Sequence, residues 1–488
     1  MEGKVMAIPW QAGIALALAG CSQPDLGSVE PEVLQGTTLR LYQPTDDAVD
    51  LLVLVDDSLS MELEQENLTR NFGVLVETLT SPADEDGDGK PDHAPVQDLH
   101  VGIISTDMGA AGFPVCDGGP AGDDGMLQHS PTTEGCAGDY PTFLSYRAGD
   151  DPSAMDRDFA CLATLGTDGC GFEQQLEAVT KALTTHANGA NAGFLREDSL
   201  LAILLVTDEE DCSVAEDRPG WQDFFDTRIR GDVPKELRCY ELGPQFLASV
   251  ESYAQQILAL RPDHPERIVM AGIVGVPLGE PCAAGDYDCL LALPSMQLVP
   301  DSSGQRLEPG CSVPGLGRAD PPRRIVETIR QVDDGGGAGI VRSICEADFR
   351  PALEAISSLI QSKFDGACLA RRLQPDADGR VECRVVETLA TGDRCPAGRI
   401  DLGLDARDDR QCQVCQIGDG TRDRLRDEIG TDLGACADPA ASGDYWRYVS
   451  ETSRCPSGQI QFEGRAVAQS GSDVRLECLS AVGGPLEP

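Results

Sequence analysis

The chain has 488 residues, which is long enough for two to four domains. Its formal net charge of −44, from 38 basic and 82 acidic residues, makes nucleic acids and anionic membrane surfaces poor partners and divalent cations natural ones. Nineteen cysteines beside only five histidines disfavour a Cys/His zinc cluster and favour disulfides formed in an oxidising compartment.

Residues 1–20 have the pattern of a secretion signal, with Lys4 as their only positive charge. Leu18-Ala19-Gly20-Cys21 resembles a bacterial lipobox, which implies lipid on Cys21 and cleavage before it. The residue after the lipid position is Ser22 and not Asp. In this respect the sequence resembles lipoproteins that are sorted to the outer membrane. We therefore expect a lipid-anchored protein in the envelope of a Gram-negative bacterium; the alternative is a plain secretory signal.

Residues 21–47 are rich in Pro, Gly, Ser and acids, and are expected to be a linker. The apolar run at residues 51–55 is typical of a strand buried on both faces of a parallel sheet. It ends in a turn that carries the oxygens of Asp56, Ser58 and Ser60. Ligands bind at the carboxyl ends of such strands, and these oxygens suit a hard cation, so we predict half of a Mg2+ site. The alternative is an ordinary turn that caps the next helix.

An amphipathic helix is expected at residues 62–80, and an acidic stretch follows it. Asp84, Asp86 and Asp88 stand at alternate positions, as in the first half of a calcium loop. An EF-hand would need Glu where Pro95 stands, and the stretch instead resembles the Asp-rich calcium repeats of thrombospondin-type proteins. That resemblance implies bound Ca2+ with Asp92 as a further ligand; the alternative is a solvated hairpin loop.

A second buried strand is expected at residues 99–106, directly before Asp107. Residues 108–170 are rich in glycine and are expected to be an irregular insertion held by disulfides. Proximity along the chain favours pairing Cys116 with Cys136 and Cys161 with Cys170.

A helix is expected from residue 169 to residue 183, and a third apolar strand at residues 200–206 is followed by Thr207 and Asp208. Further along, we expect a helix at 246–260, a strand at 268–274, a Pro/Gly-rich insertion at 276–340 and a helix at 349–360. This alternation predicts an α/β fold with a doubly wound, mostly parallel sheet flanked by helices.

Asp-x-Ser-x-Ser after one strand, with Asp208 after another, resembles the metal-ion-dependent adhesion site of von Willebrand factor A domains. The resemblance covers residues 48–365, and the cysteines are similar to those of von Willebrand A lipoproteins of myxobacteria and related Gram-negative bacteria. It implies that Asp56, Ser58, Ser60 and Asp208 hold Mg2+, or Mn2+ or Ca2+, directly or through water. It also implies one coordination position open to a carboxylate of a partner.

The chain departs from the family at the position where a Thr normally precedes the second helix. Alignment of that helix puts Glu173 there, and Thr167 lies six residues earlier. We expect Glu173 to ligate, with Thr167 as the alternative if its loop folds back. Two aspartates and a glutamate would exceed the charge of a divalent metal by one, which weakens capture of an acidic partner. Asp107 is expected in the outer shell of the site, or else as a turn residue.

Residues 366–488 hold eight cysteines and short β-runs at 380–387 and 474–479, and are predicted to form a small, disulfide-rich β module. We interpret Cys412-x-x-Cys415 as part of its disulfides; the alternatives are a redox pair and half of a zinc site.

These features predict a surface-tethered protein, not an enzyme, that binds a protein or glycan through its metal. The alternative is a structural envelope lipoprotein whose metals and disulfides only stabilise the fold. No Gly-x-Ser-x-Gly or His-Glu-x-x-His motif is present, which disfavours a hydrolase. The histidines stand in no recognisable catalytic setting, at residues 93, 100, 129, 186 and 264.

Overall fold

The structure is a computed structural model. It describes residues 34–41, 48–83, 95–113, 115–116, 122–262, 264–279, 281–363, 372–375, 379–389, 394–396, 398–405, 407–416, 444–449, 458–464 and 473–481. The predicted signal with Cys21 and the predicted calcium loop with Asp84, Asp86, Asp88 and Asp92 lie outside these residues. None of the helices in the described ranges combines the length and the apolar character that crossing a bilayer requires.

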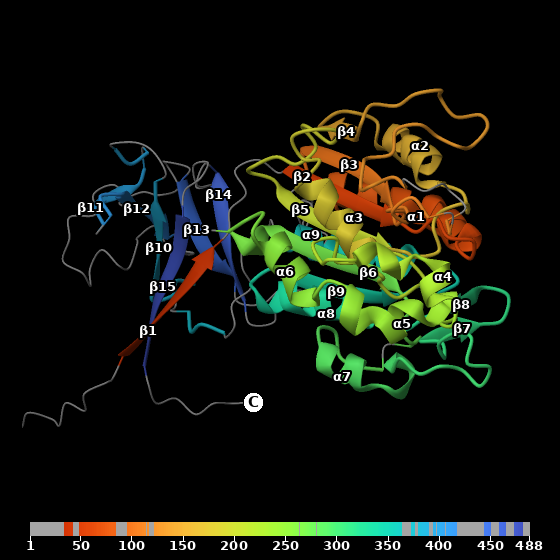
Figure 1. Cartoon of the computed structure of the whole chain (residues 1–488). Coiled ribbons are helices and arrows are strands. Elements are labelled where there is room, and N and C mark those ends of the chain that lie inside the picture. The colour runs from red at the N-terminus through yellow and green to blue at the C-terminus, as the bar shows by residue number, and fades with distance from the viewer. Residues whose placement is uncertain are drawn as a thin grey trace, which may run out of the picture.

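A six-stranded sheet organises residues 48–363 (Figure 1). All neighbouring strands are parallel except β3 (Asp98–Ser105) and β4 (Leu144–Arg147), which are antiparallel to each other. The two central strands, β2 and β5, are buried along their whole length, as their apolar runs predict. The predicted parallel-rich α/β arrangement is therefore present. The strand order is β4 (Leu144–Arg147), β3 (Asp98–Ser105), β2 (Ala48–Val55), β5 (Leu200–Val206), β6 (Ile268–Val274) and β9 (Ala338–Ser343).

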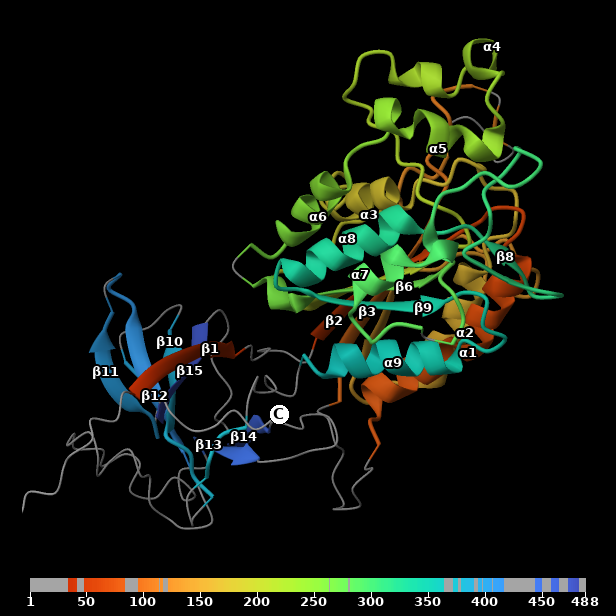
Figure 2. The same ribbon diagram turned by 90° about the horizontal axis from the view of Figure 1, so that it is seen from below.

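Helices cover both faces of this sheet, and each face has its own apolar core (Figure 2). In the first core Phe72 stacks on Phe159 with the ring centroids 3.4 Å apart, and in the second Ile329 is fully buried. The first core takes α1 (Glu62–Thr80), α2 (Pro152–Ala163) and α9 (Arg350–Gln361), and the second takes α3 (Gln175–Leu183), α6 (Val250–Leu258) and α8 (Arg323–Asp334). The connections carry α4 (Thr227–Arg230), α5 (Lys235–Phe246), α7 (Tyr287–Ala292), β7 (Cys311–Val313), β8 (Gly317–Ala319) and short 3-10 turns at Trp221–Phe224, Pro265–Arg267 and Pro294–Met296.

The disulfide pairing expected from proximity along the chain is wrong. Cys116 is bonded to Cys170, and Cys136 is bonded to Cys161. Cys170 is buried in an aromatic cluster with Phe172, and Cys116 packs against that cluster. Spatial packing of the insertion, and not spacing in the sequence, therefore sets the pairing. Further bonds in this part of the chain join Cys212 to Cys239, Cys282 to Cys289, and Cys311 to Cys345.

Three predicted boundaries are also wrong. The helix expected at 246–260 is α6, which begins only at Val250 because Ser249 caps it through its hydroxyl, and Phe246 is instead the last residue of α5. The insertion expected at 276–340 contains α8 and the first three residues of β9, and their buried apolar residues belong to the two cores of the sheet. The helix expected from residue 169 begins only at Gln175.

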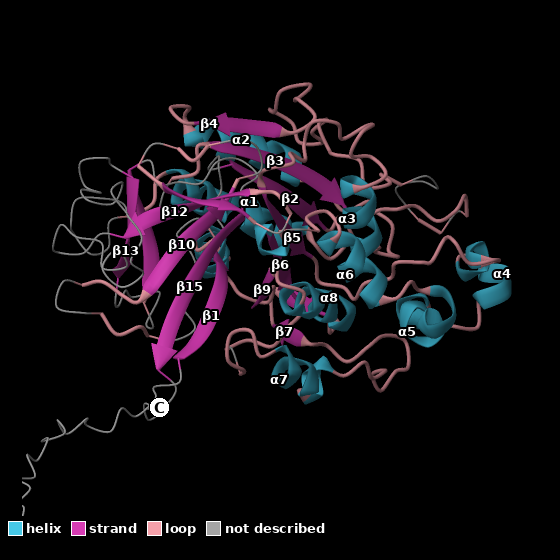
Figure 3. Ribbon diagram, turned by 90° about the vertical axis from the view of Figure 1, so that its left-hand side faces the viewer, coloured by secondary structure: helices cyan, strands magenta, loops and turns pink. Residues whose placement is uncertain are grey.

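A second sheet contains the carboxy-terminal strands and β1, as secondary-structure colouring shows (Figure 3). β1 (Leu34–Leu41) pairs antiparallel with β15 along its whole length, so these residues are a strand and not part of a linker as predicted. Cys383 is bonded to Cys478 across neighbouring strands, and Cys412 is bonded to Cys395 and not to Cys415. The other strands are β10 (Cys383–Thr388), β11 (Ile400–Leu404), β12 (Arg410–Gln416), β13 (Asp444–Val449), β14 (Gln459–Gly464) and β15 (Asp473–Ala481).

Candidate metal centre

The turn after β2 and the end of β5 lie at the same rim of the sheet. The backbone N–H of Asp56 donates to the carbonyl of Val206, 3.0 Å away, and continues the parallel ladder by one residue. The Asp56 side chain is fully buried, and its Oδ1 accepts the N–H of Ser58 at 2.8 Å. Parallel pairing therefore places the segments that carry Asp56 and Asp208 next to each other, as predicted.

The four residues assigned to the metal by resemblance form one continuous chain of polar contacts. Oδ1 of Asp56 accepts the N–H of Ser58, and the Ser58 and Ser60 hydroxyl oxygens are 3.3 Å apart. Hydrogen bonding by the side chains of Ser58 and Ser60 opposes the raised pKa of Asp56 and that of Asp208, respectively. Two acids and two hydroxyls from separate strands therefore share a single site.

Two threonines that sequence reasoning missed hold Asp56 in place. The Thr207 hydroxyl donates to Oδ2 of Asp56 at 2.5 Å and accepts from the amide of Gln175 at 2.9 Å. The Thr106 hydroxyl lies 3.4 Å from Oδ1 of Asp56 and 3.2 Å from Oδ1 of Asp57. Each threonine directly follows a strand that neighbours β2, and this position was the available sequence signal.

The loop that carries Thr167 folds back onto the same turn. The amide of the buried Gln65 donates to the carbonyls of both Asp56 and Gly166, at 2.8 Å each. The N–H of Gly169 donates to the carbonyl of Asp57 at 2.9 Å. A Cβ at Gly169 would lie 2.3 Å from a carboxylate oxygen of Asp57, so a larger residue there would force the Asp57 side chain or the loop to shift. The backbone of the loop that carries Thr167 therefore folds back toward the site, which is the condition under which Thr167 could be a ligand.

Glu173 is buried near the two aspartates of the site. Its side chain is 8 % exposed, and its carbonyl accepts the N–H of Cys212 at 2.8 Å. Burial and the neighbouring charges of Asp56 and Asp208 raise the pKa of Glu173 well above its usual value, and Lys235 opposes this rise. Glu173 is thus close enough to Asp56 and Asp208 to share their electrostatic environment.

Asp107 has turn geometry. Its Oδ1 accepts the N–H of Gly109 at 2.7 Å, and its carbonyl accepts the N–H of Asp123 at 2.7 Å. The charge of Asp107 affects the site by raising the pKa of Asp57. Burial raises the pKa of Asp57 to about 8, and the charges of Asp56, Asp107 and Asp123 add to this rise.

The rim carries more negative charge than its described cations balance. Burial raises the pKa of Asp208, with further contributions from Asp56 and Glu64. Burial and nearby carboxylates also raise the pKa of Glu209, and burial raises that of Asp320 to about 6. Mutual repulsion of this kind disfavours ionisation unless a cation shares the site.

Two buried oxygens beside this donor set are available to a cation. Oδ1 of Asp208 and Oε2 of Glu64 have no hydrogen-bond partner, although the two residues are only 3 % and 7 % exposed. Within the described ranges, no three His, Cys, Asp or Glu side chains come together as a metal-holding group. The donors therefore fit a hard cation in kind, provided that the Ser58 and Ser60 hydroxyls take part.

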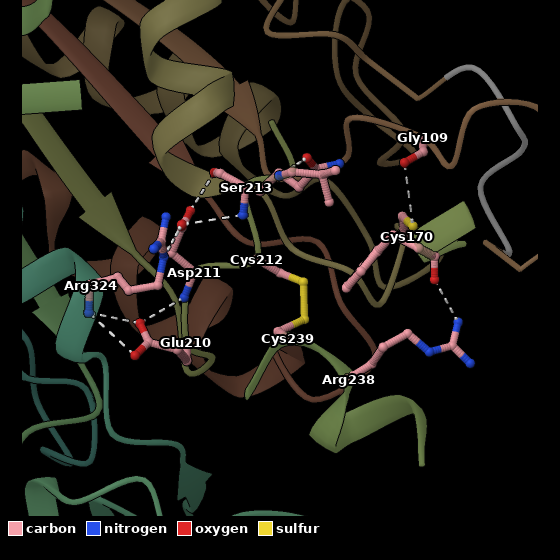
Figure 4. The surroundings of a disulfide bond; sticks show 12 residues. Gly109, Cys170, Glu210, Asp211, Cys212, Ser213, Arg238, Cys239 and Arg324 are labelled. Atoms are coloured by element: carbon pink, nitrogen blue, oxygen red, sulfur yellow. Dashed lines mark hydrogen bonds and ion pairs between the residues drawn. A yellow bond between two sulfur atoms is a disulfide. The ribbon is translucent and has the colours of Figure 1, made fainter. Parts of the chain in front are cut away.

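Further contacts hold the segment after β5. The N–H of Asp320 donates to the carbonyl of Asp208 at 2.7 Å. The backbone N–H of Arg324 donates to Glu210 at 3.0 Å, and its guanidinium donates to Asp211 at 2.8 Å (Figure 4). With the adjacent Cys212–Cys239 disulfide, these contacts fix the backbone that presents Asp208.

No family model matches the sequence, and no curated protein matches it. Among solved structures, the chain is similar to proximal thread matrix protein 1 from the mussel byssus at 10% identity and a TM-score of 0.24, covering 68% of this chain and 51% of that one. It is also similar to the human COPII-coat protein Sec24c at 8% identity and a TM-score of 0.29, covering 90% of this chain and 44% of that one. A manganese-loaded TRAP protein of Plasmodium vivax matches at 14% identity and a TM-score of 0.25, covering 75% of this chain and 95% of that one.

The chain thus spans about half the length of the first two of these proteins. All these TM-scores are low, and the likenesses carry no argument about the fold or the function of this chain. A von Willebrand A-like fold is consistent with the strand order and with the helices on both faces of the sheet.

Proposed function

We propose that the rim of the six-stranded sheet binds one divalent cation, Mg2+ or else Mn2+ or Ca2+, and that Asp56, Ser58, Ser60 and Asp208 hold it directly or through water. The observation that supports this most is the buried Asp208, whose Oδ1 has no hydrogen-bond partner and whose carboxylate bonds to Ser60. A bound cation would supply positive charge to a site where buried carboxylates repel one another.

In this proposal the surrounding residues position the ligands. Thr207 and Thr106 orient the carboxylate of Asp56, and Gln65 fixes the turn against the neighbouring loop. Glu173 is the candidate for a further ligand, with Thr167 as the alternative. The hydroxyls of Ser58 and Ser60 are neutral, so with Thr167 as the further ligand the cation keeps enough charge to attract a carboxylate or a sugar oxygen of a partner. Ligation by Glu173 would weaken the attraction for a carboxylate.

We further propose that the protein is not an enzyme and binds a protein or a glycan at the cell surface through this cation. The proposal includes lipid on Cys21, anchorage in the outer membrane, and Ca2+ held by Asp84, Asp86, Asp88 and Asp92. Growth with a labelled fatty acid tests the anchor, because label should enter the natural chain and not a Cys21→Ala variant.

A structural role of the cation is the second candidate. It is favoured by the acids beside the site, Glu64, Glu173 and Glu209, whose charges a cation would offset within the fold. In that case the envelope lipoprotein would need the metal for stability and not for capture of a partner.

Binding of the full chain to bacterial surface material in Mg2+ and in EDTA separates the two candidates. Mg2+-dependent binding that Asp56→Ala abolishes supports the adhesive role. Binding that is equal in both buffers contradicts it. A lower melting temperature of Asp56→Ala with every interaction unchanged favours the structural role.

A further inference from the structure

The edge strand β9 presents backbone hydrogen-bonding groups on its outer side. Among the described strands, β9 pairs with β6 alone, and the N–H of Ile344 donates to the carbonyl of Val274 at 2.8 Å. Hydrogen-bonding directions alternate along a strand, so the amides of Gly339, Val341 and Ser343 point away from β6. The Gly339 N–H faces the carboxylate of Asp333, whose raised pKa it opposes, which leaves Val341 and Ser343 as the outward amides of the edge. Within the described ranges, no other strand pairs with this edge.

A groove of about 560 Å3 runs along that edge. β9 forms its floor with residues 339–343, and the segment before and within α7 forms one wall. The other wall comes from the start of α9 and the turn before it. Figure 2 shows β9 running between α7 and α9. Six residues of strand span about 20 Å, so an added segment of five or six residues would match the edge in length.

The groove combines apolar and acidic groups. Ile340, Val341 and the buried Tyr287 supply apolar surface. Glu346 and Asp348 are exposed at its border. Among the described residues that line the groove, Arg342 is the one cation. Its guanidinium donates to the carbonyl of Val341 at 3.0 Å, so this outward-facing carbonyl of β9 already accepts a hydrogen bond.

We propose that this groove binds an extended peptide segment of another protein that carries Lys or Arg side chains, added as a further strand beside β9. An exposed strand edge offers main-chain bonds to an extended peptide, and pockets for alternate side chains select its sequence. The acids at the border favour cationic side chains. A second copy of this chain is a poor occupant, because each copy carries a net charge of −44. This site does not involve the cation at the rim.

Hydrogen exchange of the full chain tests the proposal with a capped octapeptide of alternating Lys and Val. The peptide should slow exchange in residues 338–344, and an octapeptide of alternating Glu and Val should not. No protection at millimolar peptide overturns the proposal, and so does equal protection by both peptides. Slow exchange of the outward amides of Val341 and Ser343 without peptide, or protection only in a dimer found by sedimentation, also overturns it, because the chain itself then fills the groove.

Two variants sharpen the test. Arg342→Ala removes a repulsive charge and a competitor for the Val341 carbonyl, so the Lys–Val peptide should bind about two- to fivefold more tightly, a gain that misfolding cannot produce. Glu346→Lys should weaken binding by a similar factor. Glu354→Lys makes the same charge change on an exposed α9 residue outside the groove, and should leave affinity unchanged. Equal affinities for all these proteins overturn the proposed role of charge.

Discussion

The hydroxyl of Thr207, at the end of β5, donates a 2.5 Å hydrogen bond to Oδ2 of Asp56, at the end of β2. Burial raises the pKa of Asp56, and this hydrogen bond is the strongest of the contacts that oppose the rise. Thr207 therefore stabilises the ionised carboxylate at the point where the two central strands meet.

Thr207→Val should lower the free energy of unfolding by about 1.5–3 kcal/mol, because a buried carboxylate loses a hydrogen bond that a methyl group cannot replace. Urea denaturation measures the change. Thr328→Val is the matched control, since Thr328 is fully buried but its hydroxyl bonds only to the carbonyl of Arg324 within α8. An equal loss of unfolding free energy in the two variants would contradict the claim that the bond from Thr207 to Asp56 contributes more than an ordinary buried hydrogen bond.

Stability without metal should fall as the pH rises from about 5 to 8. The folded pKa of Asp57 is about 8 and that of Asp320 about 6, whereas both lie near 4 in an unfolded chain. A group whose pKa is raised in the fold holds a proton that the unfolded chain releases, so its stabilisation is lost as the pH rises through that interval. Melting temperatures in EDTA at pH 5 and pH 8 measure the trend.

Asp57→Asn should flatten this dependence, because the amide does not titrate. Asp217→Asn, at an exposed residue, should leave the slope unchanged and serves as its control. The melting temperature of Asp57→Asn could instead fall with pH as steeply as that of the natural chain. That result would show that Asp57 does not contribute to the pH dependence of stability.

Gly169→Ala should disturb the loop over the rim. Its Cβ would lie 2.3 Å from the Asp57 carboxylate, so the loop or the turn must move at a cost of about 1–3 kcal/mol. Gly138→Ala is the control, because no atom lies within 4 Å of its Cβ position and its φ is not positive. Thermal melts compare the two, and a Gly169→Ala protein as stable as the control would show that the close approach carries no constraint.

Removal of the Cys116–Cys170 bond should destabilise the protein more than removal of the Cys282–Cys289 bond. The two bonds close loops with sequence separations of 54 and 7, and the entropy that a disulfide removes from the unfolded chain grows with loop length. Replacing both cysteines of each pair by serine should cost about 4 and 2 kcal/mol in that model. A reversed order, measured by urea denaturation under oxidising conditions, would contradict it.

The central sheet and the adjacency of the segments that carry Asp56 and Asp208 were accessible from the sequence, because uninterrupted apolar runs end directly in polar residues. Thr106 and Thr207 escaped notice because a threonine at a strand end has no distinctive pattern. β9 and α8 were hidden by the glycines and prolines around them, although Ile325, Ile329 and Val332 have helical spacing. The disulfide pairs depend on how the insertion folds back, which spacing along the chain does not encode.

The most direct measurement is calorimetric titration of Mg2+ into the chelator-treated full chain and into its Asp208→Ala variant, with Asp217→Ala as the control. The account predicts that the natural chain and the control bind one more Mg2+ per molecule than Asp208→Ala does, whatever other acidic sites contribute. Identical titrations of the natural chain and Asp208→Ala would contradict a cation held at the junction of β2 and β5.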